Sequence, residues 1–107
     1  MAYPVRIFDY GVIRYVVDGD TLDIQLDLGF SVKATQRFRL LRIDTPERGQ
    51  LGYAEATMYL KSFEGRPCIV HSTKTDKYGR YLAELFVDGA SVNQRMLDLR
   101  LAIPYPS

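Results

Sequence analysis

Apolar and polar residues alternate strictly between positions 21 and 28, and this pattern restricts the fold more than any other feature of the chain. The polar side of the segment comprises Asp23, Gln25 and Asp27, and its apolar side comprises Leu22, Ile24, Leu26 and Leu28. A period of two residues predicts a β-strand that has one face in the core and the other in water. We therefore expect a strand over residues 21–28 whose aspartates are solvated.

Four further segments are rich in β-branched, aromatic and other apolar residues, and they are predicted as strands. They span residues 12–17, 32–43, 68–73 and 81–87. Gly19 and Gly29 mark turns between the first three strands, so we expect these strands to form an antiparallel meander. A loop that contains Gly79 joins the last two strands.

The segment after residue 52 changes to a helical period. Its apolar residues recur at positions i, i+3, i+4 and i+7, which lie on one stripe of a helix. They are Ala56, Tyr59, Leu60 and Phe63. Gly65 and Pro67 follow the stripe and are typical signals for the end of a helix. We expect this helix to cover one end of the β-structure.

A second and shorter helix is predicted after the turn at residues 88–89. Ser91 and Gln94 have the spacing of a capping box, in which the serine side chain caps the first turn. The residues expected on its buried face are Val92, Met96 and Leu99. Pro104 and Pro106 predict that the end of the chain is not helical.

The resulting order of elements, β-β-β-α-β-β-α, is typical of a five-stranded OB-type barrel with two short helices, a β-rich α+β fold. A chain of 107 residues has no room for a second core, so we expect a single domain over residues 1–107. Closing the sheet into a barrel removes exposed strand edges. A five-stranded open sheet packed on two helices is the alternative, because composition alone does not distinguish the two.

Composition and charge limit the partners and the compartment. The formal net charge is +1, so nucleic-acid binding would need a local basic cluster rather than a general positive field. Cys68 is the only cysteine, and its apolar neighbours predict a buried thiol. The first residues contain no basic segment followed by an apolar one, and no apolar run reaches the ~20 residues of a membrane span. We expect no membrane association and an intracellular location, in the cytoplasm of its own cell or of a host cell.

Charged residues concentrate in three segments, each at a place where a strand meets a loop. The segments are residues 18–21, 39–47 and 75–80. Carboxylates of Asp20, Asp44 and Glu47 are hard oxygen ligands that suit calcium or magnesium, and such a cation neutralises a phosphate before water attacks it. Arg39 and Arg80 come from different strands, and their planar guanidinium groups match phosphate oxygens. If the barrel gathers the three segments, these residue types predict a site for phosphodiester hydrolysis.

Each segment also has an ordinary structural interpretation. Residues 18–21 alone are typical of a hairpin turn, and residues 76–80 alone are typical of a hairpin loop that contains glycine. Residues 44–47 alone fit a strand end that leads into a capped turn. Arg39 alone fits a structural ion pair. The functional interpretation depends on the combination of the three segments.

The three segments, in this order and with a predicted helix between the second and the third, resemble the staphylococcal nuclease family. The motifs that carry the resemblance are Asp-Gly-Asp-Thr at residues 18–21, Phe-Arg-Leu-Leu at 38–41 followed by Asp-Thr-Pro-Glu at 44–47, and Thr-Asp-Lys-Tyr-Gly-Arg at 75–80. The resemblance extends over roughly residues 12–103. It implies a calcium-dependent nuclease on an OB-type barrel that cleaves DNA and RNA and leaves 3′-phosphate ends.

The resemblance also implies a calcium site. In the family, calcium is held by carboxylates at the positions of Asp20 and Asp44, and by a backbone carbonyl at the position of Thr45. The implied cofactor is therefore Ca²⁺, and the implied partner is a DNA or RNA substrate.

Roles in catalysis and substrate binding follow from the same resemblance. Glu47 would hold or deprotonate the attacking water, while Arg39 and Arg80 would bind the scissile phosphate and stabilise its transition state. Lys77 and Tyr78 match positions that contact a neighbouring phosphate of the substrate. Relatives carry substrate-binding tyrosines near the end of this domain, where Tyr105 is the one candidate in this chain.

Two other functions fit parts of the sequence. A catalytically inactive nuclease-like module that binds nucleic acid or protein would lack a carboxylate or an arginine, whereas all five charged positions are present here. A plain OB-fold binder of single strands leaves the carboxylates unexplained, because acids repel phosphate unless a cation lies between them. The sequence leaves the oligomeric state, monomer or dimer, open.

Overall fold

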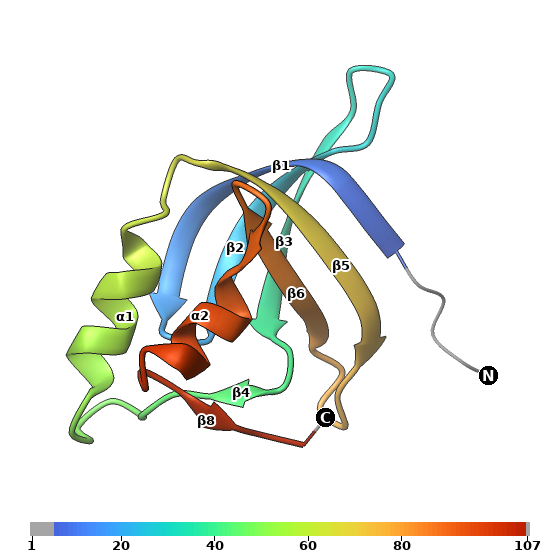
Figure 1. Cartoon of the computed structure of the whole chain (residues 1–107). Coiled ribbons are helices and arrows are strands. Elements are labelled where there is room, and N and C mark those ends of the chain that lie inside the picture. The colour runs from blue at the N-terminus through green and yellow to red at the C-terminus, as the bar shows by residue number, and fades with distance from the viewer. Residues whose placement is uncertain (1–5, 107) are drawn as a thin grey trace.

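The chain folds into a closed β-barrel with two short helices packed against it (Figure 1). The computed structural model describes residues 6–106. The barrel strands are β1 (Arg6–Asp18), β2 (Thr21–Asp27), β3 (Lys33–Leu40), β5 (Pro67–Thr75) and β6 (Tyr81–Val87). The helices are α1 (Tyr53–Lys61) and α2 (Val92–Asp98), and the short strands are β4 (Ile43–Asp44), β7 (Ala90–Ser91) and β8 (Ile103–Pro104).

The barrel closes through one parallel pair of strands. β1 pairs antiparallel with β2 and β5, β2 pairs with β3, and β5 pairs with β6. β3 and β6 then pair in parallel, with Phe38 opposite Tyr81 and Leu40 opposite Ala83. This closure confirms the predicted five-stranded OB-type barrel and the antiparallel meander of its first three strands, and it excludes the open sheet.

The alternating segment forms β2, as predicted, and its apolar side faces the barrel interior. Leu22, Ile24 and Leu26 are buried. The strand ends at Asp27, so the expected fourth member of the apolar row, Leu28, lies in the turn and is about half exposed. On the outer face Asp23 is not simply solvated, because its carboxylate forms an ion pair with Arg37 of β3.

The predicted third strand is two strands, because the chain turns sharply at residues 41 and 42. β3 ends at Leu40, and Arg42 adopts a left-handed backbone with φ of 61°. The turn directs β4 away from the barrel wall, where it pairs antiparallel with β8. The backbone N–H of Tyr105 donates to the carbonyl of Arg42 at 2.9 Å, so this pairing also determines where the last described residues lie.

The first strand is longer than predicted, since β1 starts at Arg6 and pairs along its length with two neighbours. Its early part lies beside Cys68, where an added Cβ on Gly11 would approach the Sγ atom to 3.1 Å. Cys68 is buried as predicted, and burial raises the pKa of its thiol to about 12. The thiol is therefore a packing group at neutral pH.

Helix α1 packs against β1 through the predicted stripe. Ala56 and Leu60 are fully buried, while Tyr59 and Phe63 are partly buried against the core. Beyond the helix, Gly65 has a positive φ of 86°, which a glycine adopts without strain.

Helix α2 begins as predicted, with the Ser91 hydroxyl accepting a hydrogen bond from the backbone N–H of Gln94 at 3.1 Å. The expected buried face is correct for Val92 and Met96 but wrong for Leu99, which follows the end of the helix and is about half exposed. The third buried residue of the helix is Asn93. A polar side chain takes this position because its amide satisfies three backbone groups of β6 and of the turn after β3.

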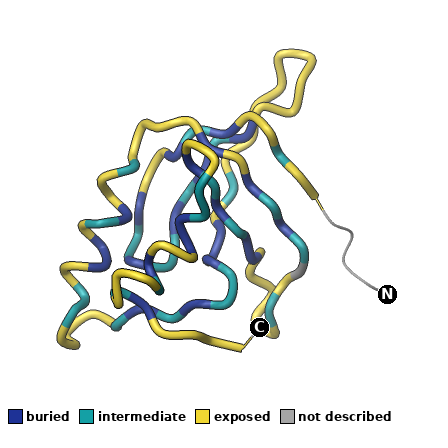
Figure 2. The backbone as a smooth tube through the Cα atoms, viewed as in Figure 1, coloured by how far each residue is buried: buried dark blue, intermediate teal, exposed yellow. Residues whose placement is uncertain are grey.

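The hairpin between β2 and β3 projects from the barrel end that lies away from β4 and β8 (Figure 1). Its tip is exposed, in contrast to the buried inner sides of the barrel strands (Figure 2). Neither of the described helices has the length and apolar character needed to cross a membrane.

Candidate active site

Side chains from separate segments line one polar pocket at the mouth of the barrel, where β1 turns into β2 and β3 leads to β4. The pocket has a volume of about 410 Å³. Predicted site residues that line it are Asp20, Arg39, Asp44, Thr45, Glu47 and Arg80. The other two predicted residues, Lys77 and Tyr78, line an adjoining groove of about 330 Å³. The fold therefore gathers the three charged segments of the sequence at one place.

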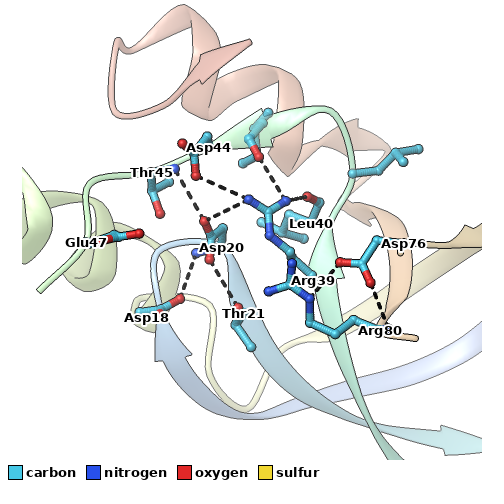
Figure 3. A network of polar contacts seen from close by, with 12 residues as sticks. Asp18, Asp20, Thr21, Arg39, Leu40, Asp44, Thr45, Glu47, Asp76 and Arg80 are labelled. Atoms are coloured by element: carbon cyan, nitrogen blue, oxygen red, sulfur yellow. Dashed lines mark hydrogen bonds and ion pairs between the residues drawn. The ribbon is translucent and has the colours of Figure 1, made fainter. Parts of the chain in front are cut away.

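Arg39 contacts two of the predicted metal ligands, which lie on the same side of its guanidinium group (Figure 3). Its side chain is buried, with the residue 7% exposed, and one terminal nitrogen lies 3.4 Å from Asp20 Oδ2 and 3.2 Å from Asp44 Oδ1. The other terminal nitrogen donates to the carbonyls of Leu40 and Ile43, each at 3.1 Å. These bonds hold the guanidinium in one orientation, with both carboxylates on its pocket side.

Asp20 is held in place by the turn that precedes β2. Its Oδ1 accepts a hydrogen bond from the Thr21 hydroxyl at 3.1 Å, and its Oδ2 also accepts from the backbone N–H of Thr45 at 3.4 Å. Strand pairing supports this position, because Thr21 lies opposite Arg39 in the β2–β3 ladder. The carboxylate therefore joins the β1–β2 turn to the segment after β3.

The turn before β2 requires a glycine at position 19, because other elements pack closely against it. A Cβ atom at this position would lie 2.9 Å from both the Ala56 Cβ and the Thr45 Oγ1. The turn can thus pack against α1 and Thr45 only without a side chain at residue 19. The sequence motif is therefore both a hairpin turn and part of the site, so the two interpretations of residues 18–21 are compatible.

Asp18 is a pocket residue that sequence reasoning did not single out. Its Oδ1 accepts a hydrogen bond from the backbone N–H of Asp20 at 3.3 Å, and it lines the pocket with the predicted acids. Partial burial, together with the nearby Asp20 carboxylate, raises the pKa of Asp18. The signal for this role was the first aspartate of the Asp-Gly-Asp-Thr motif, which an isolated hairpin turn explains equally well.

Arg80 is held by a second acid that was also missed, Asp76. Asp76 Oδ2 lies 2.6 Å from Arg80 Nε, and its Oδ1 accepts hydrogen bonds from the backbone N–H groups of Tyr78 and Arg80, each at 2.9 Å. Burial alone would raise the pKa of Asp76, but these hydrogen bonds and the Arg80 charge hold it below its ordinary value. The acid therefore keeps its negative charge and positions Arg80 beside Arg39 (Figure 3).

The adjoining groove connects with the pocket through Arg39, Arg80 and Tyr105, which line both. The Tyr105 ring lies 5.1 Å from the Arg39 guanidinium carbon, so the β4–β8 pairing brings an aromatic ring to the site. In the same groove, the exposed Tyr78 ring lies 5.2 Å from the Lys77 ammonium and 5.3 Å from the Arg80 guanidinium carbon. Aromatic faces and cations therefore flank the two arginines.

Negative charge exceeds positive charge around the pocket, since four carboxylates line it against two guanidinium groups. An anionic phosphate would be repelled by this surplus unless a cation lay between them. All the acidic side chains offer hard oxygen donors, which is the chemistry that calcium prefers. The donor set therefore fits a calcium ion in chemistry and in charge.

The acids do not form a closed cage, however. Among residues 6–106, no three His, Cys, Asp or Glu side chains are gathered closely enough to hold a metal ion by themselves. Asp20 and Asp44 face a common point because both approach the same nitrogen of Arg39. Glu47 lies farther along the wall, beyond Thr45 (Figure 3). The three predicted acids thus share a pocket, with two of them closely associated and the third apart.

A closed five-stranded barrel that carries carboxylates and paired arginines at its mouth defines a nuclease-like OB-fold protein. The sequence model of the family described as staphylococcal nuclease homologue matches residues 37–106. This chain therefore belongs to the staphylococcal nuclease family, as its motifs predicted. The matched range contains every predicted site residue except Asp20, which precedes it.

Two curated proteins are similar to this chain over part of their length. An uncharacterized protein of Bacillus anthracis is 35% identical over an alignment of 97 residues, and the match covers 80% of this chain. Protein ParB of Escherichia coli is 34% identical over 79 residues, which cover 73% of this chain. In both cases the match spans 42% of the relative's own length.

Proposed function

We propose that this protein is a calcium-dependent nuclease that hydrolyses phosphodiester bonds of DNA, RNA or both with little sequence preference, and leaves 3′-phosphate ends. The observation that carries the proposal is the single pocket that Asp20, Arg39, Asp44, Glu47 and Arg80 line together. Membership of the staphylococcal nuclease family supports the same reaction.

In this proposal, calcium is held by the carboxylates of Asp20 and Asp44 and by the backbone carbonyl of Thr45. When bound, the ion would neutralise phosphate charge and polarise the phosphorus centre. Two carboxylates and one carbonyl make a sparse ligand set, so waters and a phosphate oxygen would complete the coordination. We expect weak calcium binding without substrate, with a Kd of roughly 10⁻⁴–10⁻³ M.

The two arginines would bind the scissile phosphate. Arg39 is fixed by two backbone carbonyls, and Arg80 is fixed by Asp76, so neither guanidinium needs to be ordered when substrate arrives. Pre-organised donors of this kind stabilise charge that grows on phosphoryl oxygens in the transition state.

Glu47 would act as the general base. It lies at the exposed side of the pocket, where a water molecule has access. Glu47 would take a proton from the attacking water as the new bond to phosphorus forms, and the bond from phosphorus to the 5′-oxygen would break. The 5′-oxygen would take up a proton, and the phosphate would stay on the 3′-oxygen.

The adjoining groove would hold part of the substrate without reading its sequence. The Tyr78 and Tyr105 rings offer stacking surfaces that accept any base, and Lys77 offers a positive charge for a phosphate. Such contacts bind single or frayed strands with little base preference, since no hydrogen bonds to base edges are required.

The test is digestion of single- and double-stranded DNA and RNA by the purified protein, with calcium and with a chelator. We expect cleavage with calcium, no cleavage with chelator, and products that a 3′-phosphatase makes extendable by a polymerase. A protein that binds the same nucleic acids equally well in chelator and never cuts them would instead be the inactive binding module. Cleavage that persists in chelator would exclude the proposed role of the metal.

A further inference from the structure

A third hollow adjoins the pocket on the side away from the tyrosine groove. It has a volume of about 440 Å³ and shares Asp44, Thr45 and Pro46 with the pocket. It has no lining residue in common with the tyrosine groove, which meets the pocket instead through its two arginines and Tyr105. The three hollows therefore follow one another across the mouth of the barrel, with the pocket in the middle.

Two apolar side chains of this third hollow are largely exposed to solvent. Leu51 is 99% exposed and Ile103 is 64% exposed, and both line the hollow together with Leu101 and Ala102. A leucine with almost no contacts contributes nothing to the stability of the folded chain. Its place on the wall of a hollow beside the site points to contact with a ligand.

The loop that carries Leu51 is built to hold it outward. Gly49 and Gly52 flank it with φ of 90° and 92°, in a backbone region where other residues are strained. Gly52 also lies close to Pro46, because an added Cβ would approach the proline Cγ to 3.2 Å. The loop is therefore tight and anchored to the segment that joins the pocket to the hollow.

A positive charge completes the hollow. Arg100 lines it and is exposed, immediately after α2, with a left-handed backbone of φ 59°. An apolar surface with one arginine beside it matches the two parts of a nucleotide, which are a flat base and a phosphate. The groove on the other side of the pocket also combines a cation with apolar surface, but there the surface is aromatic and the cation is Lys77.

We propose that the hollow lined by Leu51, Arg100 and Ile103 binds the nucleotide on the far side of the scissile phosphate from the tyrosine groove. The proposal rests on the proposed nuclease function and extends it. The substrate is then a strand that continues in both directions from the cut, with one nucleotide held on each side. Contact between Leu51 and the base supplies affinity, and Arg100 binds the adjoining phosphate.

Two substitutions test the hollow. Leu51→Ala removes the apolar contact, and Arg100→Asn removes the charge while keeping a residue that tolerates the left-handed backbone. Binding of a fluorescent single-stranded oligonucleotide is measured in a Glu47→Gln background, so that the strand stays intact. We expect Leu51→Ala to raise the Kd about 5- to 10-fold. Arg100→Asn should lower the log–log salt slope of binding by about 0.7, and Arg100→Lys should restore it.

Matched controls use exposed residues away from the site. Met58→Ala removes an exposed apolar side chain of α1, and Arg14→Ala removes an exposed arginine of β1. Both should bind the oligonucleotide like the parent. Thermal unfolding of all variants shows whether any change in Kd reflects a loss of folded protein.

A pairing experiment locates the contact on the substrate. Oligonucleotides with one cleavable linkage carry an abasic residue on its 5′ side, on its 3′ side, or on neither. The effect of Leu51→Ala on Kd should disappear with one of the two abasic strands and persist with the other. Equal effects on all three strands, or no effect of either substitution, would overturn the proposed subsite while the nuclease function stands. A parent protein that neither binds nor cuts any strand would refute both.

Discussion

Two buried polar groups in this protein, Asn93 in the core and Arg39 at the mouth of the barrel, satisfy their hydrogen bonds in different ways. Asn93 is fully buried, and its amide bonds only with backbone groups, at 2.9–3.0 Å. Arg39 is also buried and also bonds with two backbone carbonyls, but its second terminal nitrogen faces the carboxylates of Asp20 and Asp44. The first network is closed, whereas the second opens onto the pocket.

The difference shows what each network can do. A closed network has no unsatisfied group, so it can only stabilise the packing of α2 against β6 and the turn after β3. The open network carries more acids than bases, and this imbalance costs stability until a cation or another ligand arrives. Substitutions in the closed network should therefore change stability alone, and substitutions in the open network should change activity first.

The largest effect should come from Glu47→Gln at the open network. If Glu47 is the general base, kcat should fall about 10²- to 10⁴-fold because the amide cannot take the proton. The melting temperature should stay within error of the parent, since Glu47 is exposed. Steady-state cleavage of a fluorescent oligonucleotide with calcium measures kcat. Glu55→Gln, at an exposed acid of α1, is the control, and full activity of Glu47→Gln would contradict the assigned role.

Asn93→Leu tests the closed network. The leucine removes the partner of the Leu85 N–H and of the Leu41 carbonyl, whereas the Ala83 carbonyl still accepts from the Leu41 N–H. The free energy of unfolding should therefore fall by about 3 kcal/mol. Urea unfolding followed by circular dichroism measures this loss. Gln94→Ala, at the exposed neighbouring residue, should lower the free energy of unfolding by clearly less. Cleavage per folded molecule should not change at low temperature, and a loss of kcat comparable to that of Glu47→Gln would break the distinction between the networks.

Asp76→Asn tests whether positioning matters at the exposed edge of the open network. Without the carboxylate, Arg80 loses its ion pair, and kcat/KM should fall about 10- to 100-fold. Asp23→Asn breaks the similar exposed pair with Arg37 and should leave cleavage unchanged. Equal activities of the two variants would show that Arg80 needs no support.

The pH dependence sharpens this prediction. The pKa of Asp76 is lowered in the folded protein, so its pair with Arg80 is intact at neutral pH. The stabilising contribution of this ion pair is present above the ordinary pKa of an aspartate. It is lost as the pH falls through the lowered pKa of Asp76. The difference in kcat/KM between Asp76→Asn and the parent should therefore become smaller only at acidic pH.

Asp18→Asn should have the smallest effect, and it should be stabilising. The pKa of Asp18 is raised, so the folded state favours its protonated form and loses stability as the pH rises through the raised value. In chelator at neutral pH, the variant should be more stable by less than about 1 kcal/mol. This gain in stability over the parent should vanish at pH values below the ordinary pKa of an aspartate. Thermal unfolding across this range checks the prediction, and a variant less stable than the parent in chelator would contradict it.

Most of the strands and helices could be predicted because their signals are local. The period of β2, the stripe of α1 and the serine cap of α2 each lie within a few residues of chain. The errors fall where distant segments decide the outcome. The left-handed turn at Arg42 separates β3 from β4, and β4 pairs with the distant strand β8. The apolar pattern predicted that Leu99 belongs to the buried face of α2, but the helix ends at Asp98.

The candidate site divides in the same way. The motifs identified the residues that line the pocket, because each motif concentrates charge at a strand end. Asp18 and Asp76 were missed because each also fits an ordinary turn. Only their contacts with Asp20 and Arg80 show that they belong to the site. No local pattern marks Leu51, whose significance depends on the hollow beside it.

The sequence by itself determined which chemical groups this protein has and which of them lie at strand ends, because the side-chain period and the turn residues are properties of neighbouring positions. The tertiary structure alone decided which of these groups meet. Arg39 reaches Asp20 because β2 and β3 pair in one register, and Tyr105 reaches Arg39 because β8 pairs with β4. Pairing between distant strands depends on the closure of the whole barrel, and no short segment contains that information.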